Sequence, residues 1–175
     1  MLWTIVCTAI LLLTVVVDRV SKSLVLAHLY EGDLALIPDV LHFTYLENRG
    51  MAFGLLADHR WVFLSLSVVG IALMTLYLIL YAKRPMSRIA LPLIIGGGIG
   101  NMIDRVMWGF VVDFINFCAF PTLWSWIFNV ADAAVCVGGF LFAIDLVLET
   151  VQEVKTQKQA ASTPSPKENE DGRDT

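Results

Sequence analysis

The sequence predicts an all-α integral membrane protein with four transmembrane helices. The first observation is composition: of 175 residues, 57% are hydrophobic and 16% are charged, and the mean hydropathy is +0.71. Soluble domains carry about 25% charged residues, so this chain is short of groups that cover a water-facing surface. The second observation is a series of long apolar runs. The length of the chain predicts one domain.

Each apolar run is judged against the membrane, whose hydrocarbon core of about 30 Å needs about 20 mainly apolar residues to cross. The run from Trp61 to Ala82 meets this length without a single charge. Three further runs meet it with a few charged residues inside. The four predicted spans cover about residues 2–27, 61–82, 86–107 and 124–148. The first run lacks a basic n-region and a small-residue cleavage site, so we predict a retained helix and not a cleaved signal.

Basic residues in the short loops predict the orientation. The connection between the second and third spans holds Lys83, Arg84 and Arg88 and no acidic residue, which places it in the cytoplasm. Both termini are then also cytoplasmic, and the mainly acidic segment from Glu31 to Arg60 is outside. Residues 152–175 are rich in Pro, Ser, Glu and Lys and are predicted to form a disordered cytoplasmic tail, which leaves 1–151 as the membrane domain.

With this orientation, polar side chains of three spans reach the same outer level of the membrane. They are Asp18, Lys22, Asn101, Asp104, Arg105, Asn129 and Asp132. A charge at membrane depth costs about 2.5–3.5 kcal/mol, so such groups usually face the bundle interior and pair. Asp18 and Lys22 are four residues apart and share a helix face. Gly96, Gly97, Gly98 and Gly100 are expected to let the third helix approach its neighbours. Asp145 lies about 20 Å further along the fourth helix and is interpreted as an interface residue.

Several other chemistries are not supported by the residues present. The three histidines, His28, His42 and His59, all lie in the first outer segment, and no HExxH motif occurs. Three cysteines without short spacings indicate neither a disulfide scaffold nor a zinc site. No basic patch indicates a nucleic-acid partner. Carboxylates remain as catalytic groups.

Two other functions are also compatible with buried aspartates. One is a small transporter, although no internal repeat is evident, and the other is a non-catalytic membrane assembly subunit.

Asp113, in the outer connection, and Asp132, at the start of the fourth span, can plausibly face each other. Two close carboxylates share a proton, because both cannot ionise cheaply. The ionised one acts as general base on a water molecule, and the protonated one polarises a scissile carbonyl. This chemistry needs no metal and no organic cofactor. A pair formed by Asp104 and Asp132 would serve equally well, so the residues alone leave both pairs open.

Five segments, in order along the chain, resemble those of the lipoprotein signal peptidase (signal peptidase II) family of aspartic peptidases. They are Asp18–Lys22, Asn48–Gly54, Gly97–Arg105, Val111–Phe114 and Phe128–Asp132. Each is a weak match alone, and the ordered set is a strong one. Two positions depart from the family pattern: Arg19 stands where Gln is usual, and Met51 where Ala is common. We expect little effect from Arg19, which lies on a different helix face from Asp18, whereas Met51 could reshape the substrate entrance.

The resemblance implies that Asp113 and Asp132 are the catalytic pair. It also implies residues that support the site or contact the substrate: Asp18, Lys22, Asn48, Gly50, Asn101, Asp104, Arg105, Asn129 and Ala131. The Asp104–Arg105 unit would then organise the site. The implied reaction removes the signal peptide of a prolipoprotein just before a diacylglyceryl-modified cysteine, without a cofactor and without an obligate protein partner.

The resemblance further implies a bacterial cytoplasmic (inner) membrane protein in contact with membrane lipids, with its active site near the extracytoplasmic surface. The outer segment of the family forms a small β-cradle, expected here at about residues 29–59. The stretch Leu41 to Leu46 alternates, with Phe43 and Tyr45 on one face, as in a strand.

Overall fold

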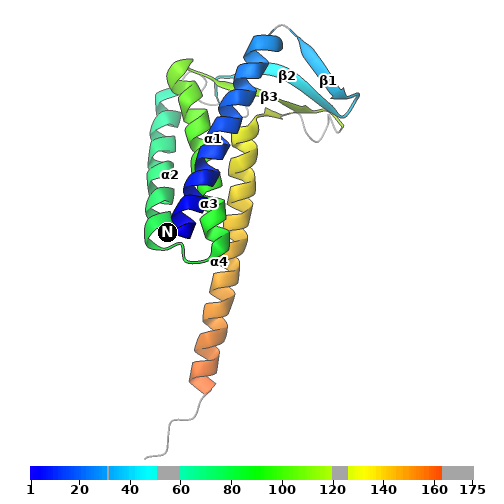
Figure 1. Ribbon diagram of the computed structural model, residues 1–175. Helices are drawn as coiled ribbons and strands as arrows, with labels where there is room; N and C mark the ends of the chain where they lie inside the picture. Colours follow the sequence, from blue (N-terminus) through cyan, green and yellow to red (C-terminus); the bar gives the residue numbers. More distant parts are fainter. Residues whose placement is uncertain (31, 51–59, 120–125, 163–175) are drawn as a thin grey trace, which may run out of the picture.

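The computed structural model describes residues 1–30, 32–50, 60–119 and 126–162. In this part of the chain, four helices form a bundle and a four-stranded sheet lies at one end of it (Figure 1). The helices are α1 (Leu2–His28), α2 (Arg60–Leu80), α3 (Pro85–Met107) and α4 (Val130–Ser162). The strands are β1 (Asp33–Ile37), β2 (Leu41–Asn48), β3 (Val111–Phe117) and β4 (Ile127–Phe128).

The bundle exposes large apolar side chains and buries several charged ones, the arrangement that suits a bilayer. All four helices are long and apolar enough to cross a membrane. Large apolar side chains on their outer surfaces are exposed, among them Leu12, Leu66 and Leu73, whereas the buried side chains include Asp18 and Lys22. Exposed apolar area on this scale indicates contact with lipid. The prediction of four helices long and apolar enough to span a membrane is confirmed within the described residues.

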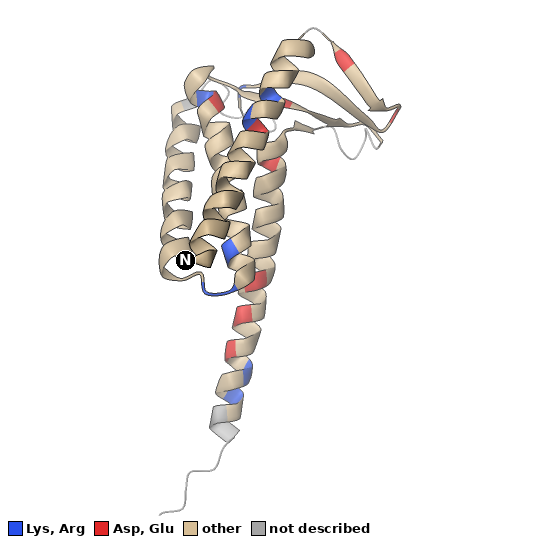
Figure 2. Ribbon diagram, viewed as in Figure 1, with Lys and Arg blue, Asp and Glu red and all other residues tan. Residues whose placement is uncertain are grey.

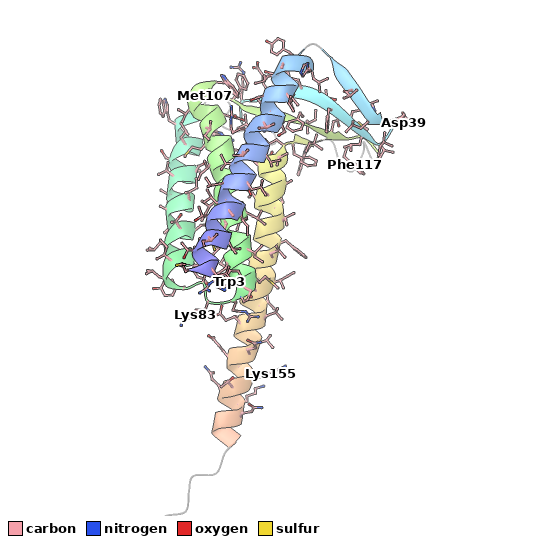
Figure 3. The ribbon with its side chains drawn as sticks, in the orientation of Figure 1. Trp3, Asp39, Lys83, Met107, Phe117 and Lys155 are labelled. Carbon is pink, nitrogen blue, oxygen red and sulfur yellow. The ribbon has the colours of Figure 1, made fainter. Side chains whose placement is uncertain are left out.

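The fourth helix differs from its predicted bounds at both ends. It begins at Val130 and not near residue 124, because Ile127 and Phe128 are taken up by strand β4. It continues to Ser162, past the predicted start of the tail at residue 152, and Lys155 lies on the part that extends beyond the other helices (Figure 3). Residues 152–159 include Gln, Glu and Lys, which are good helix formers and extend a helix that is already nucleated. Residues 163–175 lie outside the described part.

The sheet is larger than the predicted cradle. Its strands are antiparallel in the order β1-β2-β3-β4, and the last two come from the connection between α3 and α4. Asp113 therefore stands in a strand, opposite Leu46 of β2, so an all-α description is incomplete. The predicted strand from Leu41 to Leu46 is confirmed within β2. Residues 51–59, Met51 among them, lie outside the described residues.

The sheet is fixed to the bundle by a small apolar cluster. Val25, near the end of α1, packs with Val112 and Phe114 of β3, all at most 4% exposed. Phe43 of β2 meets Phe114 edge to face, with ring centroids 5.5 Å apart. Because Asp113 lies between Val112 and Phe114 in β3, this packing holds its backbone against the ends of the helices.

Helix α3 lies at the centre of the bundle and contacts α1, α2 and α4. A Cβ atom at Gly97 would overlap the backbone of Ala131 on α4. One at Gly100 would lie 2.5 Å from Asp18 Oδ2 on α1, whereas Gly98 faces Ile71 of α2. The prediction that these glycines permit close helix packing is confirmed, and two of the close approaches lie beside the predicted site.

Candidate active site

Several charged residues lie on the helix ends next to the sheet (Figure 2). The innermost is Lys22, which is fully buried. Its Nζ atom lies 2.9 Å from Asp18 Oδ2, 2.8 Å from Asp104 Oδ2 and 3.0 Å from Asn101 Oδ1. An ammonium group has three donors, so each has an acceptor here. The predicted pairing of Asp18 with Lys22 is confirmed, and Lys22 joins α1 to α3.

Asp104 has a second cationic partner, Arg19, whose NH1 group donates to Asp104 Oδ1. Arg19, from which little effect was expected, reaches α3 with its long side chain and lies over Trp108, 4.9 Å from the ring centroid. Asp104 Oδ2 also accepts the backbone N–H of Val112 at 3.2 Å. Two carboxylates, Asp18 and Asp104, thus face two cations, and this balanced group contacts the residue just before Asp113.

Arg105 does not form the predicted unit with Asp104. Its NH1 group donates to the backbone oxygen of Asn101 at 3.3 Å, and its guanidinium lies 5.3 Å from the ring centroid of Phe63. Successive residues on a helix point to different faces. Asp104 consequently faces α1 while Arg105 turns towards α2.

Asp113 is held by neutral amides. Its Oδ1 accepts a hydrogen bond from Asn129 Nδ2 at 2.7 Å, and its Oδ2 accepts one from Asn48 Nδ2 at 2.8 Å. The side chain is 1% exposed. Burial first, and the negative charge of Asp132 second, raise the pKa of Asp113 from 3.8 to about 7, against the opposing effect of the two amides. A carboxyl group of this kind exchanges its proton near neutral pH.

Asp132 lies in the first turn of α4 and is half-buried. Its Oδ1 accepts Asn101 Nδ2 at 2.7 Å, and its Oδ2 accepts the backbone N–H of Asn129 at 3.2 Å. Asn129 Oδ1 in turn accepts the backbone N–H of Asp132 at 2.8 Å, a reciprocal cap on the helix. The helix N-terminus favours negative charge at this position. Asn129 therefore contacts both candidate catalytic carboxylates.

Asp132 also lines an open cavity between α2, α3 and α4, with a volume of about 430 Å³. Asn101 and Arg105 line it beside Asp132, and apolar residues such as Ile71, Met74 and Val135 line the remainder. Asp18 and Asp104, by contrast, are fully buried and do not line it. This cavity offers a lipid-side approach to one carboxylate of the predicted pair.

The structure brings nearly all predicted site residues into one network. Besides those already described, Gly50 donates its N–H to Asn48 Oδ1 at 3.2 Å, and Ala131 donates its N–H to Asp18 Oδ1 at 3.0 Å. The alternative pair of Asp104 with Asp132 is disfavoured, because two cations hold Asp104. Sequence reasoning did not predict the contacts of Arg19 with Asp104 and Trp108. The available signal was that Arg19 is a third charged residue, beside Asp18 and Lys22, in the first apolar run.

Comparisons with known proteins agree with this site. A family model described as signal peptidase (SPase) II matches residues 10–148. The chain belongs to the signal peptidase II family. The lipoprotein signal peptidase of Clostridium tetani is 41% identical over 142 residues, which cover 80% of this chain and 91% of that protein. That of Photorhabdus laumondii is 42% identical over 158 residues, covering 84% and 87%.

Solved structures show a similar fold. Two structures of a bacterial membrane enzyme, determined by the in meso method at 2.3 Å and 1.9 Å resolution, have TM-scores of 0.76 and 0.74. Each is 29% identical in sequence, and they cover 83% and 81% of this chain. This member of the signal peptidase II family is therefore a membrane peptidase, and the transporter and assembly-subunit interpretations fall away.

Proposed function

We propose that the chain is an aspartic endopeptidase that removes the signal peptide from prolipoproteins, cleaving just before a diacylglyceryl-modified cysteine. Relatives named lipoprotein signal peptidases support this substrate class. One observation supports the aspartic mechanism above all: Asp113 and Asp132 both hydrogen-bond to Asn129, and Asp132 lines an open cavity. Two carboxylates that contact one asparagine, with one of them lining an open cavity, supply the general acid and the general base of peptide hydrolysis.

The two carboxyl groups are assigned different protonation states. Asp113 carries the shared proton, since it is almost fully buried and its pKa is raised to about 7. Asp132 is the ionised base, since a helix N-terminus and a donated amide N–H stabilise its charge. The pair then holds one proton between two carboxylates, the state that general acid–base catalysis requires.

The reaction follows from these states. Asp132 removes a proton from water as the water oxygen bonds to the scissile carbonyl carbon, and Asp113 gives its proton to the carbonyl oxygen. The tetrahedral intermediate collapses when Asp113 takes that proton back and Asp132 protonates the departing amine. Both carboxyl groups end in their starting states. Neither a metal nor a cofactor takes part in these steps.

The surrounding residues keep the two carboxylates in place. Asn48 and Asn129 orient Asp113, and Asn101 orients Asp132 while accepting from Lys22 on its other side. Amides position a carboxylate without neutralising it, so proton exchange remains possible. The ion pairs of Lys22 anchor this amide layer to α1.

The position in the membrane follows from charge. Lys83, Arg84 and Arg88 lie at the end opposite the sheet, and basic loops face the cytoplasm. We place the chain in the bacterial cytoplasmic membrane, with both termini cytoplasmic and the sheet outside. A peptide bond next to a lipid-anchored cysteine lies at the outer surface, the level of Asp113 and Asp132. The substrate would enter sideways, with its apolar part in the cavity between α2, α3 and α4.

The test is cleavage of a diacylglyceryl-modified prolipoprotein by the purified full chain in lipid. Asp113→Asn and Asp132→Asn are each expected to lower kcat by about 10³-fold or more, because general acid–base groups contribute about 10²–10⁴-fold. Asp39→Asn is the matched control: Asp39 is exposed in the turn before β2 with φ 60°, which Asn tolerates, so activity should persist.

Two outcomes would contradict the proposal. Activity that survives in Asp113→Asn but is lost in a folded Asp104→Asn variant would move the catalytic role to Asp104. Cleavage of an unmodified precursor at the same rate as the lipidated one would remove the lipid from the substrate definition. Circular dichroism of each variant in the same detergent shows whether a loss of activity reflects chemistry or folding.

A further inference from the structure

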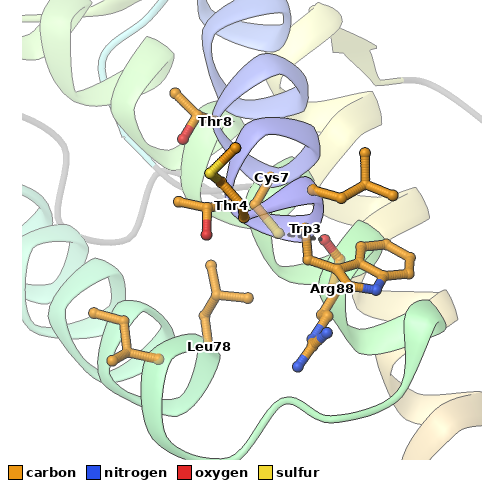
Figure 4. Close-up of a pocket in the computed structure, with 9 residues that line it drawn as sticks. Trp3, Thr4, Cys7, Thr8, Leu78 and Arg88 are labelled. Atoms are coloured by element: carbon orange, nitrogen blue, oxygen red, sulfur yellow. Dashed lines mark hydrogen bonds between the residues drawn. The ribbon is translucent and has the colours of Figure 1, made fainter.

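A second cavity lies at the end of the bundle opposite the sheet, far from the proposed active site (Figure 4). It has a volume of about 620 Å³ and lies between the start of α1, the end of α2 and the first turn of α3. Trp3, Thr4 and Thr8 of α1 line one side, Leu78 and Ile79 of α2 another. Nothing in the proposed hydrolysis uses these residues.

Arg88 supplies the only charged side chain among the described residues that line this cavity. Its Nε donates to the backbone oxygen of Ala82 at 2.8 Å, and its guanidinium lies 5.5 Å from the ring centroid of Trp3. Figure 4 shows the end of the Arg88 side chain pointing away from α1, on the side of the connection between α2 and α3. Backbone and ring contacts orient the group without cancelling its charge.

A buried acid at this end of the bundle, Asp145, contacts residues other than Arg88. Asp145 is paired with Arg84, whose Nε lies 2.7 Å from Asp145 Oδ1, and it also accepts a hydrogen bond from Ser87. In the described part of the chain, the connection between α2 and α3 contains basic residues and no acidic ones. The cavity therefore has a net positive charge. A partly buried guanidinium of this kind favours an anionic ligand, especially a phosphate.

The apolar walls specify what the anion is attached to. From Leu2 to Thr8 the cavity follows α1 for about 9 Å, at 1.5 Å per residue. Leu2, Leu78 and Ile79 give it an apolar lining on the lipid-facing side. α1 begins and α2 ends at this level, so Arg88 lies where lipid headgroups meet the hydrocarbon. Trp3 is an aromatic residue of the type enriched at that interface.

We propose that this cavity binds an anionic phospholipid. The phosphodiester contacts the free side of the Arg88 guanidinium, and the first methylene groups of an acyl chain lie along α1 and α2 between Thr8 and Leu78. Basic pockets between transmembrane helices recognise acidic lipid headgroups in this way. The lipid would belong to the leaflet opposite the sheet. This proposal does not depend on the peptidase mechanism.

The experiment uses the delipidated full chain in detergent, titrated with phosphatidylglycerol and with phosphatidylcholine of the same acyl chains. Native mass spectrometry counts the bound lipid. Wild type is expected to bind phosphatidylglycerol more tightly than phosphatidylcholine. Arg88→Gln should weaken phosphatidylglycerol binding about tenfold, the factor for about 1.4 kcal/mol. Lys83→Gln is the matched control, since Lys83 is exposed on the same connection and does not line the cavity, and it should change binding less than twofold.

A second variant tests the acyl-chain part separately. Thr8→Phe fills the apolar portion from an exposed, lipid-facing position and should weaken phosphatidylglycerol binding without unfolding the protein. Three results would overturn the proposal. They are equal losses in Arg88→Gln and Lys83→Gln, equal affinity for the two lipids, and inorganic phosphate that binds as tightly as phosphatidylglycerol. The last result would identify an anion site to which the acyl chain contributes nothing.

Discussion

Buried aspartates lie at both ends of the helix bundle. At the end away from the sheet, Asp145 of α4 is fully buried, pairs with Arg84 and accepts a hydrogen bond from Ser87, both near the start of α3. At the sheet end, Asp113 is equally buried but its side-chain partners are the amides of Asn48 and Asn129. One carboxylate is held by a cation and the other by neutral donors.

The difference shows which buried carboxyl groups can exchange a proton and so act as a catalytic acid or base. A cation stabilises the ionised carboxylate and occupies its oxygens, which makes a fixed joint between helices. An amide fixes the orientation of a carboxylate and leaves its charge open to change, and the pKa of Asp113 is raised to about 7. The sheet end contains both types: Lys22 forms the joint with Asp18 and Asp104, and the amides above it form the site.

The largest effect is expected from Lys22→Met, which removes the cation between two fully buried carboxylates. Breaking a buried ion pair costs about 3–5 kcal/mol, because charge is left without a partner. Arg84→Met should cost less, since Arg84 is 27% exposed and Asp145 keeps Ser87. Unfolding in mixed detergent measures both variants. Equal losses of stability in the two variants would contradict the proposed difference between the two ends of the bundle.

The next prediction concerns pH and Asp113. Protonated Asp113 is the proposed acid, and that form is lost as the pH rises through about 7. Above that pH, kcat/KM should fall about tenfold per pH unit, the slope for loss of one proton. Initial rates of prolipoprotein cleavage across the range measure this. A rate that stays level well above neutral pH would assign the proton elsewhere.

Stability should follow the same group with a defined sign. Asp113 has a raised pKa in the folded chain and 3.8 as its ordinary value, so the native state binds the extra proton between about pH 4 and about pH 7. Its contribution to stability is full below that window and is lost as the pH rises through it. Asp113→Asn lacks this dependence. The free energy of unfolding of the variant should therefore rise relative to that of wild type as the pH increases from about 4 to about 7.

The sequence predicted the parts of this comparison that depend on helix periodicity. Asp18 and Lys22 share a face at a spacing of four residues, and charges at membrane depth pair, so their contact followed from spacing and burial cost. The convergence of α1, α3 and α4 at one level followed from the positions of polar residues along the apolar runs. The resemblance of five segments to a family then selected Asp113 over Asp104 as the partner of Asp132.

What the sequence could not predict depends on tertiary contacts. The placement of Arg19 against Asp104 depends on the distance between α1 and α3, which helical spacing within α1 does not contain. Strand β3 pairs with β2, which lies far away in the chain, so Asp113 was expected in a connection. Asp145 was interpreted as an interface residue, but the structure buries it beside Arg84, because α3 begins where α4 passes.

Helix spacing at the sheet end can be altered directly. A Cβ at Gly100 would press against the Asp18 carboxylate, and overpacking costs about 1–3 kcal/mol. Gly100→Ala should therefore lower both thermal stability and cleavage rate, because it displaces Asp18 from Lys22. Gly139→Ala on α4 is the matched control, since a Cβ there meets nothing within 4 Å. Equal behaviour of the two variants would show that the helices tolerate wider spacing.

The smallest effect on activity is expected from Asp145→Asn, at the end opposite the sheet. The substitution removes the charge that Arg84 and Ser87 contact, and a hydrogen bond to a charged group contributes about 1.5–3 kcal/mol. Stability should fall by about that amount, while the cleavage rate measured on the remaining folded protein stays at the wild-type level. If the cleavage rate fell as far as is expected for Asp132→Asn, the two ends of the bundle would be coupled through α4. Asp145 would then contribute to catalysis and not only to stability.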